Sequence, residues 1–163
     1  MKLPSGRNVN NYTPIYTGSN FTWGEVTKNG QRPLQDLIIK GRLILVSMDI
    51  EQKIIDTAVK LDGVRALLGD RPLYVNSWYR PAHINKRVGG SEWSRHQFGD
   101  AVDIRSDYFK PIQIYSKLRD IHQGGLGKYW SFVHIDWRGE LARWGGWNFN
   151  LRQFFGLVPV PHY

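Results

Sequence analysis

The stretch SRHQFGDAVD at residues 94–103 and the stretch VHID at residues 133–136 decide the interpretation of this sequence. They contain His96, Asp103 and His134, whose side chains are of the kinds that bind zinc in proteins. Three protein ligands leave a fourth position open to water, which distinguishes a catalytic zinc site from a structural one. Water in such a position ionises near neutral pH and becomes a nucleophile. The two stretches therefore predict the metal site of a hydrolase.

The second stretch has the pattern of a strand with two unlike faces. Alternation over residues 132–137 places His134 and Asp136 on one face and Val133 and Ile135 on the other. An apolar face directed to the core and a polar face at the end of a sheet suit a metal site.

The rest of the chain predicts a small α+β domain, with helices where apolar residues recur every three or four positions and strands where β-prone runs occur. The expected helices are residues 51–68 and 111–121, the expected strands are residues 72–79, 101–104 and 132–137, residues 43–46 are a strand or a buried linker, and residues 82–95 are a loop. Residues 1–20 are expected to form an N-terminal arm and residues 21–163 a single domain that contains the metal site. These elements predict a small antiparallel sheet with helices packed on it.

The amino-acid composition limits the possible metal ligands and binding partners. The chain has no cysteine, which excludes disulfides and thiolate zinc ligands and leaves histidine and carboxylate ligands. The net charge of +8 attracts polyanions such as nucleic acid or the bacterial cell wall, but scattered Lys and Arg argue against nucleic acid. No apolar run is long enough for a membrane span, and residues 1–8 lack the apolar core of a signal peptide. Delivery to a cell wall would then need a phage particle, a holin or a specialised export system.

Flanking motifs connect the predicted site to a known family. The sequence SWYRP at residues 77–81 comes first, the pattern Ser-x-His-x-x-Gly-x-Ala-x-Asp follows at residues 94–103, and FVHID at residues 132–136 comes last. This order resembles the zinc D-alanyl-D-alanine carboxypeptidase and L-alanyl-D-glutamate endopeptidase family of peptidoglycan peptidases. The family includes bacterial cell-wall enzymes and phage endolysins, and its fold is shared with the Hedgehog signalling domain. The resemblance covers roughly residues 21–144.

The resemblance assigns roles to individual residues. It implies that His96, Asp103 and His134 hold Zn2+. Arg80, expected at the end of a strand, would bind a peptide carboxylate or stabilise an oxyanion, which is the work of the matching Arg in the family. Ser94 matches a serine that helps to bind substrate.

Two tryptophans flank these motifs. Trp93 directly precedes the Ser94 element, and Trp130 lies in the expected loop before His134. Both are expected either to contact substrate or to pack under the site.

The sequence departs from the family at one position. Many members carry Glu or Asp three residues before the last zinc-binding histidine, where the carboxylate activates water and protonates the leaving amine. Here the position is Ser131. Asp136 would take that role, or would instead orient a ligand; His122 would swing in from the preceding loop; or the chain binds zinc and hydrolyses slowly or not at all. Of these the sequence favours Asp136.

The leading expectation is a zinc metallopeptidase that cleaves peptide bonds in peptidoglycan stem peptides, as a phage lysin or a virion-associated enzyme. The alternative is a non-catalytic, zinc-stabilised module of a phage tail that binds the cell wall or plays a structural part, with phage structural proteins as partners. Ser131 favours the alternative, whereas a set of only three ligands favours the enzyme, because structural zinc usually has four protein ligands. A nucleic-acid-binding domain is a distant third.

Overall fold

The computed structural model describes residues 1–145; the end of the expected domain, residues 146–163, lies outside the described residues. The helices are α1 (Trp23–Thr27), α2 (Ser47–Leu67), α3 (Ala82–Arg87) and α4 (Pro111–Leu118), with a short 3-10 helix η1 (Arg95–Gln97). The strands are β1 (Leu37–Ile39), β2 (Arg42–Leu45), β3 (Tyr74–Ser77), β4 (Ala101–Arg105), β5 (Gly125–Lys128), β6 (Val133–Asp136) and β7 (Ala142–Trp144). The predicted α+β class is confirmed.

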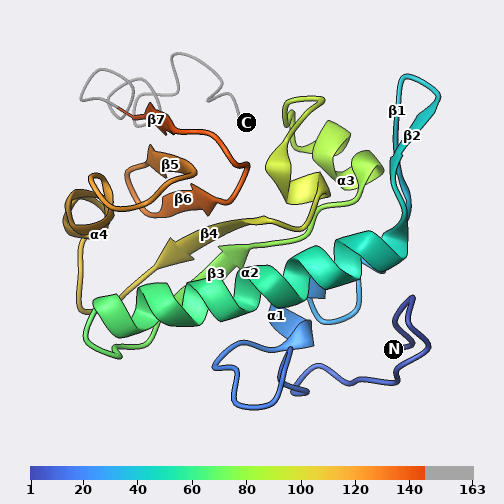
Figure 1. The fold of residues 1–163 in the computed structure, drawn as a ribbon, viewed down its shortest axis with the longest axis horizontal. Helices are drawn as coiled ribbons and strands as arrows, with labels where there is room; N and C mark the ends of the chain where they lie inside the picture. Colours follow the sequence, from blue (N-terminus) through green and yellow to red (C-terminus); the bar gives the residue numbers. More distant parts are fainter. Residues whose placement is uncertain (146–163) are drawn as a thin grey trace.

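The main sheet has the strand order β3-β4-β6-β5-β7, and β1 and β2 form a separate hairpin. All neighbouring strands of the main sheet are antiparallel except β5 and β7, which are parallel. The long helix α2 lies across the sheet, and the β1–β2 hairpin projects beyond its N-terminal end (Figure 1). The central strands β4 and β6 are the two that carry the predicted ligands Asp103 and His134.

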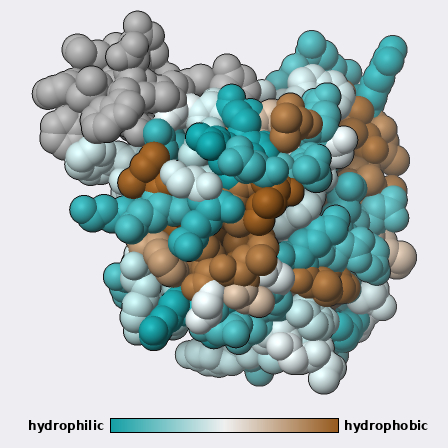
Figure 2. Space-filling view, turned by 60° about the vertical axis from the view of Figure 1, so that its left-hand side comes forward, coloured by the Kyte–Doolittle hydropathy of each residue, from teal (hydrophilic) through white to brown (hydrophobic). Residues whose placement is uncertain are grey.

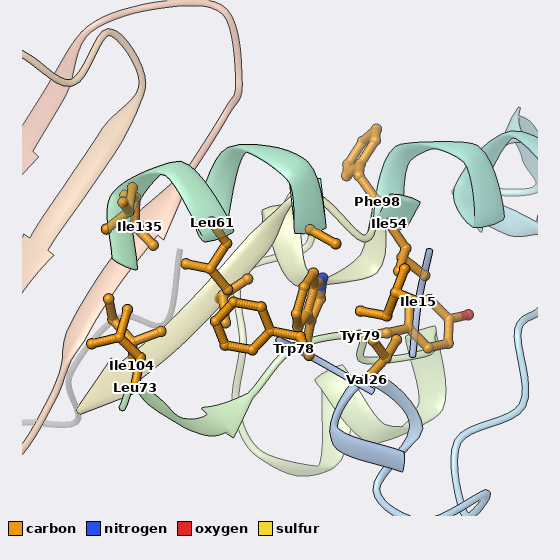
Figure 3. Close-up of a cluster of buried hydrophobic side chains, with 14 of the residues drawn as sticks. Ile15, Val26, Ile54, Leu61, Leu73, Trp78, Tyr79, Phe98, Ile104 and Ile135 are labelled. Atoms are coloured by element: carbon orange, nitrogen blue, oxygen red, sulfur yellow. The ribbon is translucent and has the colours of Figure 1, made fainter. Parts of the chain in front are cut away.

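The hydrophobic core lies between α2 and one face of the sheet. Ile54 and Leu61 of α2 face Trp78, Ile104 and Ile135, all of them almost completely buried (Figure 3). Neighbouring residues of a strand point to opposite faces of the sheet. Asp103, next to Ile104, and His134, next to Ile135, therefore point away from α2. The core therefore fixes which face of the sheet carries the candidate site.

Some predicted elements differ from the structure in their type or in their bounds. The expected loop at residues 82–95 begins with the helix α3 and ends on the first residue of η1, so that prediction is wrong at these residues. The helix expected at residues 51–68 begins earlier, at Ser47, whose backbone N–H donates to the carboxylate of Asp36. The first twenty residues contain no helix or strand, yet they bury Leu3, Val9 and Ile15 in the core.

Polar residues dominate the surface seen in Figure 2, and apolar side chains reach it between them. Within residues 1–145, no helix has both the length and the apolar character that crossing a membrane requires.

Candidate metal centre

The three predicted ligands meet at the face of the sheet opposite α2. His96 belongs to η1, Asp103 to β4 and His134 to β6, and Asp103 and His134 are direct cross-strand partners. One potential ligand atom from each residue lies within 4.8 Å of the others, and all three side chains are buried. Gly99 makes the turn between η1 and β4: its φ of +83° suits glycine, and a Cβ there would lie 2.7 Å from Ile54 of α2.

Hydrogen bonds hold both imidazole rings with one nitrogen directed at Asp103. Nδ1 of His96 lies 2.7 Å from the carbonyl oxygen of Trp78, which can only accept, so Nδ1 carries the proton and Nε2 faces Asp103 Oδ1 at 3.3 Å. Nε2 of His134 lies 2.9 Å from Asp136 Oδ2, and its Nδ1 lies 3.0 Å from Asp103 Oδ1. Each ring is thus anchored through one nitrogen and presents the other.

The two histidines differ in charge. Burial lowers the pKa of His96 below its ordinary value of 6.5, so this ring is neutral near pH 7. Burial also acts to lower the pKa of His134, but hydrogen bonds with Asp103 and Asp136 outweigh burial and raise it to about 9. Burial acts to raise the pKa of Asp103, yet the attraction of His96 and the hydrogen bonds of both histidines hold it well below its usual range. A metal ion would therefore displace a proton from His134.

This donor set fits zinc. Two imidazoles and one carboxylate are ligands that zinc accepts in sites with an open position. A zinc-binding histidine usually donates its other ring N–H to a carbonyl or a carboxylate, and Trp78 and Asp136 supply these acceptors here.

Arg80 lies beside the ligands. Its backbone N–H donates to the carbonyl of His96, its Nη2 lies 3.8 Å from Asp103 Oδ2, and its Nη1 donates to Asn85 Oδ1 at 3.4 Å. The side chain is buried, which makes Arg80 a fixed cation at the edge of the metal site.

Ser94 is completely buried, and its hydroxyl has no hydrogen-bond partner within residues 1–145. An unpaired buried hydroxyl costs about 1–3 kcal/mol, so its retention is typical of a site that binds a ligand.

Asp136 is held on the far side of His134 from Asp103. Its carboxylate accepts from the backbone N–H of Gly125 at 3.1 Å and from Arg138 Nε at 2.9 Å and Nη2 at 2.6 Å. Any Cβ at position 125 would overlap this carboxylate, which explains the glycine there. Because Asp136 has no exposed surface, its contacts suit the orienting role better than proton exchange with a substrate.

The other sequence candidates lie away from the ligand atoms or at the surface. His122 Nε2 bonds the backbone carbonyl of Asp136 at 2.8 Å, and its ring packs edge-on against Trp137. Ser131 is exposed, as are Trp93 and Trp130, so neither tryptophan packs under the site.

Sequence reasoning missed several contributors. Arg138 lies two positions after Asp136. In an extended chain this spacing places both side chains on one face, so the sequence could have indicated their contact. Lys28 and Arg32 approach β3 from a distant segment, and Asn85 lies in the unpredicted helix α3, so no local pattern points to them.

Comparison with known proteins agrees with the motifs. A family model described as Peptidase M15 matches residues 33–136, more than half of the chain, and includes Arg80 and all three candidate ligands. A zinc D-Ala-D-Ala carboxypeptidase of Streptomyces albus G is 42% identical over 48 residues, which are 29% of this chain and 19% of that protein. The matched stretch thus spans about a fifth of the relative's length. The expected family is confirmed: the chain belongs to the peptidase M15 family.

Proposed function

We propose that this chain is a zinc-dependent peptidase that cleaves peptide bonds in peptidoglycan stem peptides. The observation that carries the proposal is the meeting of His96, Asp103 and His134 beside the buried cation Arg80. Membership of the peptidase M15 family and the similarity to a zinc D-Ala-D-Ala carboxypeptidase support it.

Zinc would be held by His96 Nε2, the carboxylate of Asp103 and His134 Nδ1. Zinc, when bound, would act as a Lewis acid that polarises a peptide carbonyl and lowers the pKa of a water molecule. Arg80 binds a carboxylate of the peptide or the oxyanion that develops during hydrolysis, since its guanidinium is buried and fixed by Asn85. Ser94 donates its otherwise unpaired hydroxyl to the bound peptide.

Asp136 is a positioning residue in this proposal. It accepts the Nε2 proton of His134 and so keeps Nδ1 free for the metal. The ion pair with Arg138 keeps Asp136 ionised, in agreement with a pKa well below the usual range: burial acts to raise that pKa, and the hydrogen bonds from Arg138 and His134 prevail.

The experiment is digestion of peptidoglycan sacculi with purified protein, with and without a chelator, followed by mass spectrometry of the released fragments. We expect new amine termini that disappear with the chelator and in His134→Ala. The matched control is His83→Ala, because His83 is exposed on α3 and should leave cleavage unchanged. Fragment masses identify the bond and separate carboxypeptidase from endopeptidase action.

Ser131 favours a second candidate, a zinc-stabilised module that binds the cell wall without cutting it. Stoichiometric zinc with intact sacculi in the same experiment would select this candidate. In both cases we propose a phage-encoded or virion-associated protein that acts at the cell wall, a setting supported by the net charge of +8, which favours contact with anionic wall polymers.

A further inference from the structure

Two cations from the segment after α1 lie against strand β3. The ammonium group of Lys28 donates to the carbonyl of Asn76. Arg32 Nη1 donates to the carbonyl of Tyr79 at 3.1 Å and to Ser77 Oγ at 3.4 Å. Both cations are thus fixed by neutral oxygen atoms of one strand and the residues that follow it.

This position is on the same face of the sheet as the metal centre. Ser77 is the cross-strand partner of Asp103, so the two side chains share one face. Charge interactions agree: burial and the neighbouring Arg32 lower the pKa of Lys28, while Asp103 acts to raise it. Burial lowers the pKa of Arg80, Asp103 acts to raise it, and Arg32 acts with burial to lower it.

The cluster of Lys28, Arg32 and Arg80 carries more positive than negative charge. Within residues 1–145, no carboxylate lies within 4.0 Å of Lys28 or Arg32, whereas Arg80 shares Asp103 with two histidines. Lys28 and Arg32 are half-buried, and burial lowers the pKa of each. Cations that are partly desolvated, fixed in place and not neutralised attract an anion strongly.

We propose that Lys28 and Arg32 form a carboxylate subsite next to Arg80, so that the preferred ligand is a peptide with two carboxylates near the metal centre. A peptide that contains D-Glu meets this requirement, because one glutamate carboxyl group remains outside the backbone amide bond. The inference rests on the proposed function for the class of ligand. Both cations lie outside the family-matched residues 33–136.

The test is isothermal titration of the zinc-loaded full chain with L-Ala-D-Glu and with the same dipeptide amidated at one glutamate carboxyl group. We expect about tenfold tighter binding of the dicarboxylate, the size of one charge-assisted hydrogen bond in a partly exposed site. Lys28→Met and Arg32→Gln should each reduce this preference to about threefold or less. Lys28→Arg and Arg32→Lys, which keep the charge, should retain most of it, and Lys60→Met on the exposed face of α2 should retain all of it.

Equal binding of the two dipeptides by the unmodified protein would overturn the subsite. So would a preference that survives in Lys28→Met and Arg32→Gln, provided that thermal unfolding shows both variants to be folded. A preference for the dicarboxylate in a protein that cuts no sacculi would retain the subsite and reject the peptidase. Cleavage of sacculi without the preference would do the reverse.

Discussion

The strand pair β4–β6 buries side chains on both faces, but for opposite physical reasons. One face packs under α2 and consists of Val102, Ile104, Val133 and Ile135. The other face includes Asp103, His134 and Asp136; His134 contacts both carboxylates, and Arg138 contacts Asp136. The apolar face stabilises the fold by about 1.5–3 kcal/mol for each large side chain. Burial of the polar face costs the free energy of its lost hydration, and the hydrogen bonds among its side chains offset that cost.

The comparison teaches that the fold and the site are separable contributions of the same strands. Alternation gives each strand both functions, and the sheet keeps the metal ligands rigid while α2 supplies stability from the other side. Substitutions on one face should therefore change zinc binding, and substitutions on the other should change the free energy of unfolding. The largest effect should come from the metal itself.

Zinc should stabilise the folded protein by about 4 kcal/mol at a free concentration a thousandfold above its dissociation constant. The reason is that folding assembles the three ligands, so zinc binds the folded state in preference. Thermal unfolding with zinc and with a chelator measures this, and His96→Ala should abolish the difference. A zinc-dependent rise that persists in His96→Ala would show that His96 is not a ligand.

Ile135→Ala should cost about 3 kcal/mol of unfolding free energy, because it opens a cavity between β6 and α2. Zinc affinity of the folded variant should not change, since the neighbouring His134 faces the other way. Urea unfolding in chelator gives the first quantity, and competition with a metal indicator gives the second. Leu67→Ala, at the exposed end of α2, is the control and should stay within about 0.5 kcal/mol. Weakened zinc binding in Ile135→Ala would mean that the two faces are coupled.

Asp136→Asn should weaken zinc binding by about 10- to 100-fold, as expected for loss of a carboxylate that orients a zinc-binding histidine. At saturating zinc the turnover number should recover, because a positioning residue acts through metal occupancy. A turnover number that stays low at full occupancy would instead assign proton transfer to Asp136, the role that the sequence favoured. Asp107→Asn, in an exposed pair with Arg105, is the matched control.

The strands that carry two of the three candidate ligands could be predicted because their signals are local. Alternation over residues 132–137 gave β6 and its two faces, and the apolar spacing of residues 51–68 gave most of α2. The short sequence GLGK of β5 has no such signal, since its glycines are required by atoms from elsewhere: Asp136 fills the space above Gly125, and Trp144 fills that above Gly127.

Contacts between segments distant in the chain could not be predicted from the sequence either. Strand β7 pairs in parallel with β5. Hairpin patterns in a sequence indicate only antiparallel neighbours, so they do not predict this pairing. Lys28 and Arg32 reach the site through the carbonyls of Asn76 and Tyr79, and main-chain acceptors leave no trace in side-chain patterns. The motif residues could be found because the chemistry constrains them, whereas their supporting cations follow only from the tertiary fold.

The smallest expected effect on the free energy of unfolding comes from Asp62, a carboxylate near the surface, and it tests how far burial decides stability. Asp62 on α2 accepts from the Tyr16 hydroxyl at 2.6 Å and from Ser19 and Asn20, which ties the first residues to the helix. The hydrogen bond to Asp62, with smaller effects of burial and charge, raises the pKa of Tyr16 from 10.0 to about 12.

Asp62→Asn should move the pKa of Tyr16 back toward 10.0 and cost less than about 1 kcal/mol, since water screens this network. The folded-state pKa lies above the unfolded one, so the contribution of Tyr16 is complete below pH 10 and disappears as the pH rises toward 12. Ultraviolet titration of tyrosinate, with Tyr16→Phe to identify the step, measures the pKa. A loss as large as that of Ile135→Ala would mean that the polar anchors of the first residues, and not burial alone, decide the stability of this fold.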